Sequence, residues 1–141
     1  MKKTFCLILL FAILCVPCSF GFSEDMSIED KVIVYYFHGI YRCMTCNAME
    51  AYSKEAVETN FKDELNSGTL EFESINVEDK ANEHFVEDYG LYTKSLILSR
   101  VVAGEEVESK NLDKIWEYSR NKNRFITYIT EELNEFLEEE K

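Results

Sequence analysis

The chain has 141 residues, of which 46% are hydrophobic and 13% aromatic, so it can bury the core of one domain of ordinary size. This composition excludes a disordered tail protein. The formal net charge of −12 leaves few cations to neutralise phosphates, so we expect an acidic, solvated exterior and no nucleic-acid partner.

Residues 1–21 have the composition of a secretory signal peptide. Two lysines precede an apolar run over 5–16, and small residues follow, so cleavage is expected after Gly21. The apolar run is too short to span a bilayer, and we expect no membrane span in the mature chain. A lipid anchor on Cys15 or Cys18 is the alternative, although neither follows the small residue that lipid-attachment sites prefer. The leader predicts a periplasmic or secreted protein.

Cleavage of the leader would leave only Cys43 and Cys46, because Cys6, Cys15 and Cys18 would be removed. A pair three residues apart closes a very small loop and cannot brace distant parts of a fold. An inert staple is therefore the less favoured hypothesis. A redox pair and a site for a soft metal or metalloid are the other two.

The first half of the remaining chain predicts alternating strands and a helix. Residues 22–31 form a polar segment that we expect to be mobile. The β-branched and aromatic run over 31–37 predicts a strand buried on both faces. Apolar residues at near-helical spacing over 47–65 predict one helix, which is expected to begin at residue 44, directly after Cys43. A second strand is predicted over 69–77.

The following segment predicts a short helix and a hairpin. Apolar residues at i, i+4 and i+8 predict a helix over 78–90, with Gly90 closing it. Two strands are predicted over 94–109, joined by a hairpin at Gly104–Glu105.

The last segment predicts two helices rather than one bent helix, because a polar run interrupts the apolar stripe. The first is expected over 111–119, with Asn111 as its N-cap, and the second over 125–137. An acidic tail follows over 138–141. The order of elements predicts an α/β three-layer sandwich, a mixed four-stranded sheet flanked by helices, over the domain 32–137.

This order, with Cys-x-x-Cys where the first strand meets the first helix, resembles the thioredoxin-like fold. The stretches LEFESINVED, YGLYTKSLIL and AGEEVES are similar to the second strand, the turn before the third strand, and the hairpin of thioredoxins. More narrowly, YYFHG…RC.TC..ME.Y resembles the secreted ArsF-type thioredoxin-fold proteins, known as nitrophenyl-compound nitroreductase subunits. The resemblance implies the fold and thiol chemistry. No flavin or nicotinamide fingerprint supports nitroreduction, so no cofactor is expected besides the Cys43–Cys46 disulfide.

The sequence departs from thioredoxins around the cysteine pair. Arg42 stands where they carry tryptophan, and Met-Thr replaces the Gly-Pro between the cysteines. Tyr36 replaces their buried aspartate, and the slot of their cis-proline falls at Lys94 or Ser95. These departures favour a specialised relative over a general disulfide exchanger, and the lost proline leaves room for a metal.

Four residues are candidates for the chemistry. Cys43, at the start of a helix, is the expected nucleophile, because free N–H groups, the helix dipole and Arg42 favour its thiolate. Cys46, one turn deeper, is the expected resolving thiol. His38 is a candidate proton acceptor in place of the missing aspartate, a third metal ligand, or a strand-end histidine bonded to backbone.

Neighbouring residues receive weaker assignments. Tyr36 and Tyr41 are expected to form an aromatic wall, although Tyr36 also fits a core position. Glu50 is expected to be a solvated helix charge rather than a proton relay, and His84 receives no role. Trp116 is expected to pack the last helix onto the sheet.

These residues predict a monomeric, extracytoplasmic thiol–disulfide oxidoreductase or redox partner that acts on a protein thiol or disulfide. One Cys-x-x-Cys pair lacks the four ligands of a structural zinc site, so no metal is expected. Cu(I) or trivalent arsenic needs fewer thiolates, so a carrier that uses Cys43, Cys46 and His38 is the alternative. An accessory subunit with an inert disulfide is the third hypothesis.

Overall fold

A computed structural model of the chain describes residues 30–138. The predicted signal peptide over 1–21, nearly all of the predicted mobile segment and the end of the acidic tail lie outside this range. Within residues 30–138, no helix is both long and apolar enough to cross a membrane.

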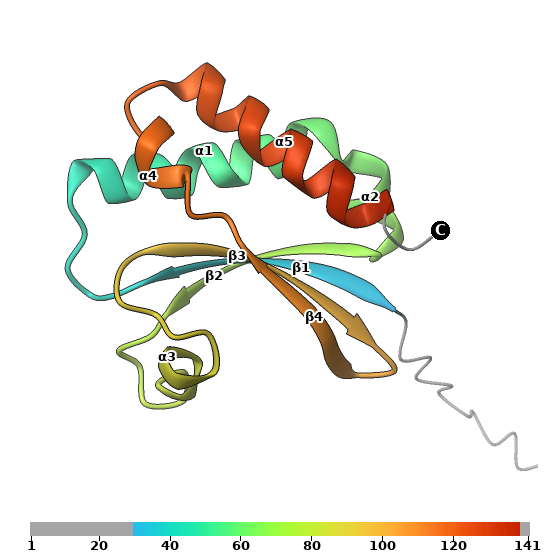
Figure 1. Cartoon of the computed structure of the whole chain (residues 1–141), viewed down its shortest axis with the longest axis horizontal. Helices are drawn as coiled ribbons and strands as arrows, with labels where there is room; N and C mark the ends of the chain where they lie inside the picture. The colour runs from blue at the N-terminus through green and yellow to red at the C-terminus, as the bar shows by residue number, and fades with distance from the viewer. Residues whose placement is uncertain (1–29, 139–141) are drawn as a thin grey trace, which may run out of the picture.

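Four strands form one mixed sheet in the order β2-β1-β3-β4 (Figure 1). The first two strands are parallel, and β3 runs antiparallel to both of its neighbours. The bounds are β1 Lys31–His38, β2 Leu70–Asn76, β3 Ser95–Val102 and β4 Glu105–Asn111. Thus the strand predicted over 31–37 is confirmed as an internal strand of the sheet.

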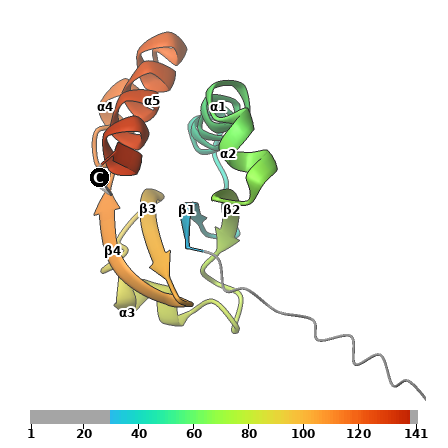
Figure 2. The ribbon, with the colours of Figure 1, turned by 90° about the vertical axis from the view of Figure 1, so that its right-hand side faces the viewer.

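Helices form a layer on each face of the sheet, as Figure 2 shows. On one face α1 and α5 pack against each other, with α2 and α4 in the same layer. On the other face, α3 is the only helix within residues 30–138. The bounds are α1 Met44–Asn60, α2 Lys62–Ser67, α3 His84–Asp88, α4 Ile115–Tyr118 and α5 Lys122–Glu138. The predicted class, a mixed four-stranded sheet flanked by helices, is confirmed.

The alternation of side chains along β1 divides the core in two. Val34 and Tyr36, both fully buried, face the larger helical layer, where Met49 of α1 and Phe125 of α5 pack. Phe37, on the opposite face, belongs to a smaller cluster with Leu91 and Ile97, and the aromatic rings of α3 pack against it. Because β1 is buried on both faces, its end at His38 is held in place, and so is the start of the loop that leads to Cys43.

The helix predicted from 44 to 65 begins where expected but is broken near its end. It starts at Met44, directly after Cys43, and ends at Asn60. Phe61 adopts φ −128° and ψ 45°, outside the helical region, and its side chain is buried. Burying this ring turns the chain, so that α2 continues in a new direction.

The helix predicted over 78–90 is largely wrong, since only His84–Asp88 is helical. Polar side chains compete with a helix just before it. The Asn76 side chain accepts from the Glu78 N–H and donates to Asp79, and Asn82 donates back to the Asn76 carbonyl. Such local bonds stabilise turns at the expense of a helix. Gly90, with φ +59°, follows the helix end in the manner predicted.

The hairpin and the C-terminal helices are confirmed with shifted bounds. The turn is formed by Ala103 and Gly104, both with positive φ, one residue earlier than predicted. This combination is typical of a two-residue hairpin turn. Asn111 is the last residue of β4, so its predicted N-cap role is wrong. The two predicted helices are α4 and α5, and α4 has only four residues.

Three connections meet at one end of the sheet. The end of β1 lies beside the start of β3, where Phe37 pairs with Ser95. The end of β4 reaches the same end, where Asn111 pairs with Ile97. The loop before α1, the loop before β3 and the segment that leads into α4 therefore surround the Cys-x-x-Cys pair.

Candidate functional site

Cys43 and Cys46 occupy unequal positions at the start of α1. Cys43 is the N-cap of the helix and is exposed, whereas Cys46 lies in the first turn and is 3% exposed. The two form a disulfide with a Cα–Cα separation of 5.1 Å, within the usual range for such bonds. A partner from solvent can therefore reach the sulfur of Cys43 far more easily than that of Cys46.

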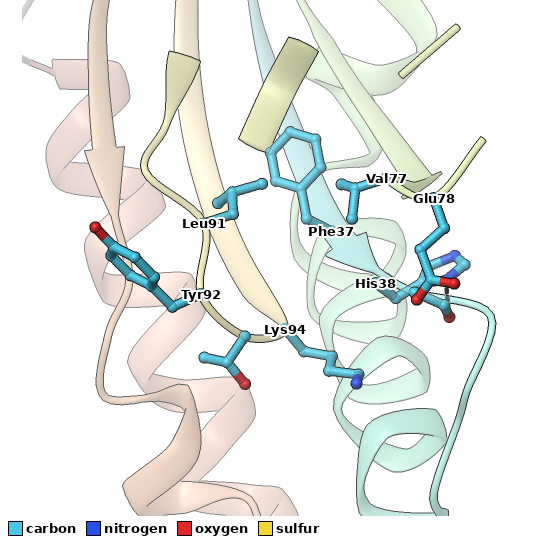
Figure 3. Close-up of a pocket in the computed structure, with 9 residues that line it drawn as sticks. Phe37, His38, Val77, Glu78, Leu91, Tyr92 and Lys94 are labelled. Carbon is cyan, nitrogen blue, oxygen red and sulfur yellow. Dashed lines mark hydrogen bonds between the residues drawn. The ribbon is translucent and has the colours of Figure 1, made fainter. Parts of the chain in front are cut away.

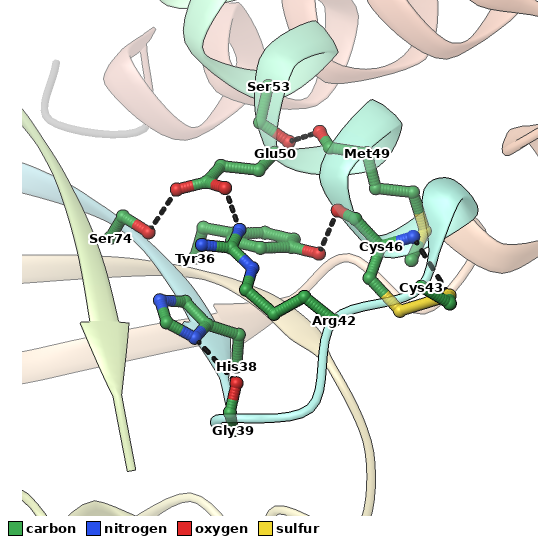
Figure 4. Close-up of polar contacts among 10 residues, drawn as sticks. All are labelled: Tyr36, His38, Gly39, Arg42, Cys43, Cys46, Met49, Glu50, Ser53 and Ser74. Atoms are coloured by element: carbon green, nitrogen blue, oxygen red, sulfur yellow. Dashed lines mark hydrogen bonds and ion pairs between the residues drawn. A yellow bond between two sulfur atoms is a disulfide. The ribbon is translucent and has the colours of Figure 1, made fainter. Parts of the chain in front are cut away.

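The sulfur of Cys43 also serves as the capping group of the helix. The backbone N–H of Cys46 donates to Cys43 Sγ over 3.2 Å. N–H groups of a first helical turn lack partners inside the helix, and the helix dipole is positive at this end. Figure 4 shows this contact at the disulfide. The free N–H groups and the dipole both favour negative charge on Cys43 Sγ whenever the disulfide is open.

Tyr36 lies beneath the cysteine pair and is fully buried. Its hydroxyl donates to the backbone carbonyl of Cys46 over 2.8 Å, which joins β1 to the first turn of α1. Burial raises the pKa of Tyr36 to about 12, although the nearby Arg42 charge opposes this shift. The expected aromatic wall is therefore wrong for Tyr36, which is a core residue, while Tyr41 is exposed.

Arg42 turns back along the protein and pairs with Glu50. Its guanidinium forms an ion pair with the Glu50 carboxylate, which also accepts from the Ser74 hydroxyl (Figure 4). Both charged side chains are about three-quarters buried, so the expectation of a solvated Glu50 is wrong. In Figure 4 the guanidinium points towards Glu50 rather than towards the sulfurs.

His38, at the end of β1, does not join the cysteines. Its Nδ1 lies 3.0 Å from the carbonyl of Gly39, and in the view of Figure 4 Arg42 separates its ring from the disulfide. A hydrogen bond to a carbonyl requires the proton on Nδ1, which leaves Nε2 as the acceptor of a neutral ring. In the part of the chain that the structure describes, no three His, Cys, Asp or Glu side chains are grouped as metal ligands.

Trp116 is a site residue that sequence reasoning assigned elsewhere. It is 41% exposed and does not pack the last helix onto the sheet, so that expectation is wrong. Its indole N–H donates to the carbonyl of Lys94 over 2.9 Å. Trp116 and Cys43 line the same open hollow, together with Thr45 and Arg120.

A smaller hollow lies on the other side of Lys94. It is formed by the ends of β1 and β2 and by the loop before β3, and Lys94 points into it (Figure 3). The carboxylate of Glu78 lies beside His38 and covers Gly39, where a Cβ would collide with it. The ring of Tyr92 points outward and is fully exposed.

Topology was the available signal for Trp116. Because β4 returns to the end of the sheet that carries the cysteines, any residue just after β4 lies near them. The signal for Glu50 was its place one helical turn after Cys46 on the same face. Neither signal predicted the hydrogen bond of Trp116 to Lys94 or the ion pair of Glu50 with Arg42.

Comparisons with known proteins place the chain in no family. No family model and no curated protein matches it. A solved structure of a malarial protein is 16% identical and covers 57% of this chain and 80% of its own, with a TM-score of 0.38. A thioredoxin from Thermus thermophilus is 14% identical and covers 64% of this chain and 72% of its own, with a TM-score of 0.37. The strand order and the cysteine pair at the β1–α1 junction agree with the predicted thioredoxin-like arrangement.

Proposed function

We propose that Cys43 and Cys46 exchange their disulfide with a cysteine of a partner protein. The observation that carries this proposal is the contrast between the two sulfurs. Cys43 is exposed and its sulfur accepts the N–H of Cys46, whereas Cys46 is buried. The Cys43 sulfur then forms the mixed disulfide with the partner, either as the sulfur that a partner thiolate attacks or as the attacking thiolate. Cys46 resolves that mixed disulfide when the protein reduces its partner.

The position of the pair supports exchange over a structural staple. The bond joins residues three apart at one helix start, so its loop contributes little to the free energy of unfolding. A buried tyrosine and a paired arginine hold the surrounding backbone in place. Because these contacts hold the backbone without the disulfide, the disulfide can be reduced and reformed repeatedly and is not needed to stabilise the fold.

The wider setting belongs to the same proposal. The predicted leader puts the protein in the periplasm or outside the cell, where thiol–disulfide exchange is common. We infer a monomer with no cofactor beyond the disulfide, and kinship with the ArsF-type proteins at the level of thiol chemistry. His38 and Arg42 are inferred to influence proton and charge balance from nearby rather than by contact with the sulfurs.

A trapping experiment tests the proposal. In the Cys46→Ser variant a mixed disulfide on Cys43 cannot be resolved, so partners in an extracytoplasmic extract are expected to remain attached until reductant releases them. Cys43→Ser/Cys46→Ser is the matched control and is expected to trap nothing. Absence of trapped partners, with stoichiometric Cu(I) or arsenic on the purified protein, would establish the carrier instead. Absence of both would favour the inert disulfide.

A further inference from the structure

Apolar side chains gather at the end of the sheet that carries Cys43. Among residues 30–138, seven large hydrophobic side chains are exposed, and five of them lie in the segments that surround the cysteine pair. Single exposed apolar residues are ordinary, whereas a group around one reactive sulfur marks a contact surface for another molecule. We call these five the recognition face: Ile40, Tyr41, Met44, Tyr92 and Trp116.

The hollow beside Cys43 gives this face a shape. It has a volume of about 510 Å³ and is bounded by the start of α1 and by α4. The hydrogen bond from Trp116 to the Lys94 carbonyl fixes the indole as one wall. Small-molecule sites usually enclose most of their ligand, whereas this hollow is open along one side. It therefore fits a polypeptide segment that passes over Cys43.

The charges at the hollow are unlike those of the whole protein. Arg120 lines it, and among residues 30–138 no carboxylate forms an ion pair with its guanidinium. Lys94 contributes only its backbone carbonyl here, because its side chain points into the second hollow (Figure 3). The carboxylate of Glu117, in the same hollow, is 3.8 Å from the guanidinium of Arg124. In the second hollow Glu78 lies beside His38. In a chain with a net charge of −12, Arg120 thus lines the same hollow as Cys43 without an ion pair among the described residues.

We propose that this hollow binds the residues beside the reacting cysteine of a partner protein, with an apolar side chain against Trp116 and a carboxylate facing Arg120. The inference rests on the proposed thiol–disulfide function and adds a substrate preference to it. The protein is expected to react faster with partner cysteines that have apolar and acidic neighbours than with partner cysteines that have glycine and serine, or lysine, as neighbours. Burial of apolar surface supplies affinity, and the opposite charges select and orient the segment.

The covalent step transfers two electrons in two exchanges. A thiolate of the partner attacks Cys43 Sγ, the Cys43–Cys46 bond breaks, and Cys46 leaves as a thiolate. A second thiolate of the partner then attacks the sulfur bound to Cys43, and Cys43 leaves as a thiolate. The partner gains a disulfide and the protein becomes a dithiol. With a partner disulfide and the reduced protein, the same steps run in reverse. A second thiol–disulfide couple restores the starting state.

Peptides with an activated cysteine test the preference. Reduced Cys46→Ser protein is mixed with short peptides whose cysteine carries thionitrobenzoate, so that attack by Cys43 releases the coloured thionitrobenzoate. Three peptides differ only in the residues on both sides of cysteine: phenylalanine with aspartate, phenylalanine with lysine, and glycine with serine. The first is expected to react about tenfold faster than the third, and the second to fall between them.

Variants locate the preference in the hollow. In the Cys46→Ser protein, Trp116→Ala is expected to remove the advantage of phenylalanine, and Arg120→Glu to reverse the order of the aspartate and lysine peptides. Val107→Ala, at another exposed apolar position, and Lys62→Glu, an equal charge change on α2, are the matched controls. Both are expected to leave all three rates unchanged.

Failure of this inference differs from failure of the proposed function. If dithiobis-nitrobenzoate reacts with Cys43 but the three peptides react equally, or if Trp116→Ala and Arg120→Glu change nothing, the inference is wrong and the exchange chemistry stands. If Cys43 reacts neither with the peptides nor with dithiobis-nitrobenzoate, both are wrong.

Discussion

The hydroxyl of Tyr36 donates a hydrogen bond to the backbone carbonyl of Cys46 at 2.8 Å, in a position closed to solvent. This single contact connects the central strand to the first turn of the helix that carries the disulfide. It places a neutral donor, rather than a carboxylate, directly beneath Cys46.

Replacement of Tyr36 by phenylalanine tests this connection. The ring remains buried, and only the hydroxyl is lost, so the free energy of unfolding is expected to fall by about 1 kcal/mol at neutral pH. Urea denaturation followed by circular dichroism measures the change. Tyr41→Phe, at an exposed position, is the matched control and is expected to have no effect. Equal stability of Tyr36→Phe and the unmodified protein would contradict the structural role of the bond.

The same substitution also changes the pH dependence of stability. The pKa of Tyr36 rises from 10.0 to about 12 in the folded protein, because burial disfavours the phenolate. Above pH 10 the unfolded chain loses a proton that the folded protein keeps, so the free energy of unfolding falls as pH rises through 12. Tyr35 and Tyr128, also raised to about 12, add to this fall. Tyr36→Phe is expected to make the decline shallower between pH 10 and 12, and an unchanged slope would contradict the assignment.

The ion pair of Arg42 and Glu50 is expected to be coupled energetically. Both side chains are about three-quarters buried, so removal of one partner leaves a charge in a poorly solvated place. In a double-mutant cycle, Arg42→Gln and Glu50→Gln are each expected to lower the free energy of unfolding, with a coupling of about 1 to 2 kcal/mol between them. The cycle is measured by urea denaturation of the four proteins.

An exposed ion pair provides the control for that cycle. On α1, Lys54 Nζ lies 3.7 Å from Glu58 Oε1, and both side chains are more than half exposed. Their coupling is expected to be a few tenths of a kcal/mol at most. If the two pairs show the same coupling, the Arg42–Glu50 pair does not hold the loop before α1.

The two thiols of the reduced protein are expected to differ in reactivity. Iodoacetamide reaches Cys43 directly, whereas Cys46 is 3% exposed and must wait for the first turn of α1 to open. We expect alkylation of Cys43 to be at least about tenfold faster, as measured by mass spectrometry of digested protein. Addition of denaturant should equalise the two rates. Equal rates in the folded state would remove the distinction between nucleophile and resolving thiol.

The fold was predictable where a pattern has one structural solution. The β-branched and aromatic run that ends at Phe37 is typical of a strand buried on both faces, and β1 is such a strand. Cys43 at a helix start followed from the same order of elements. The segment over 78–90 was misassigned because Asn76 and Asn82 form side-chain bonds to nearby backbone, and periodicity does not register such bonds.

The positions of the two cysteines in the candidate site were predictable from the sequence, whereas the contacts of the neighbouring side chains were not. The places of Cys43 and Cys46 depend on local helix geometry, which the sequence carries directly. The partners of Arg42 and Trp116 depend instead on contacts between distant segments, Glu50 and Ser74 for the first, Lys94 for the second. Long side chains can reach several partners, and only the folded arrangement selects one.

A redox titration of the folded protein tests the central claim most directly. The protein is equilibrated with mixtures of reduced and oxidised glutathione, the thiols are alkylated, and the fraction of dithiol is measured by mass. The account predicts one two-electron transition above about −300 mV, with glutathione attached only to Cys43 at intermediate ratios. A disulfide that stays oxidised across the whole range, or that is reduced only when the protein unfolds, would contradict it.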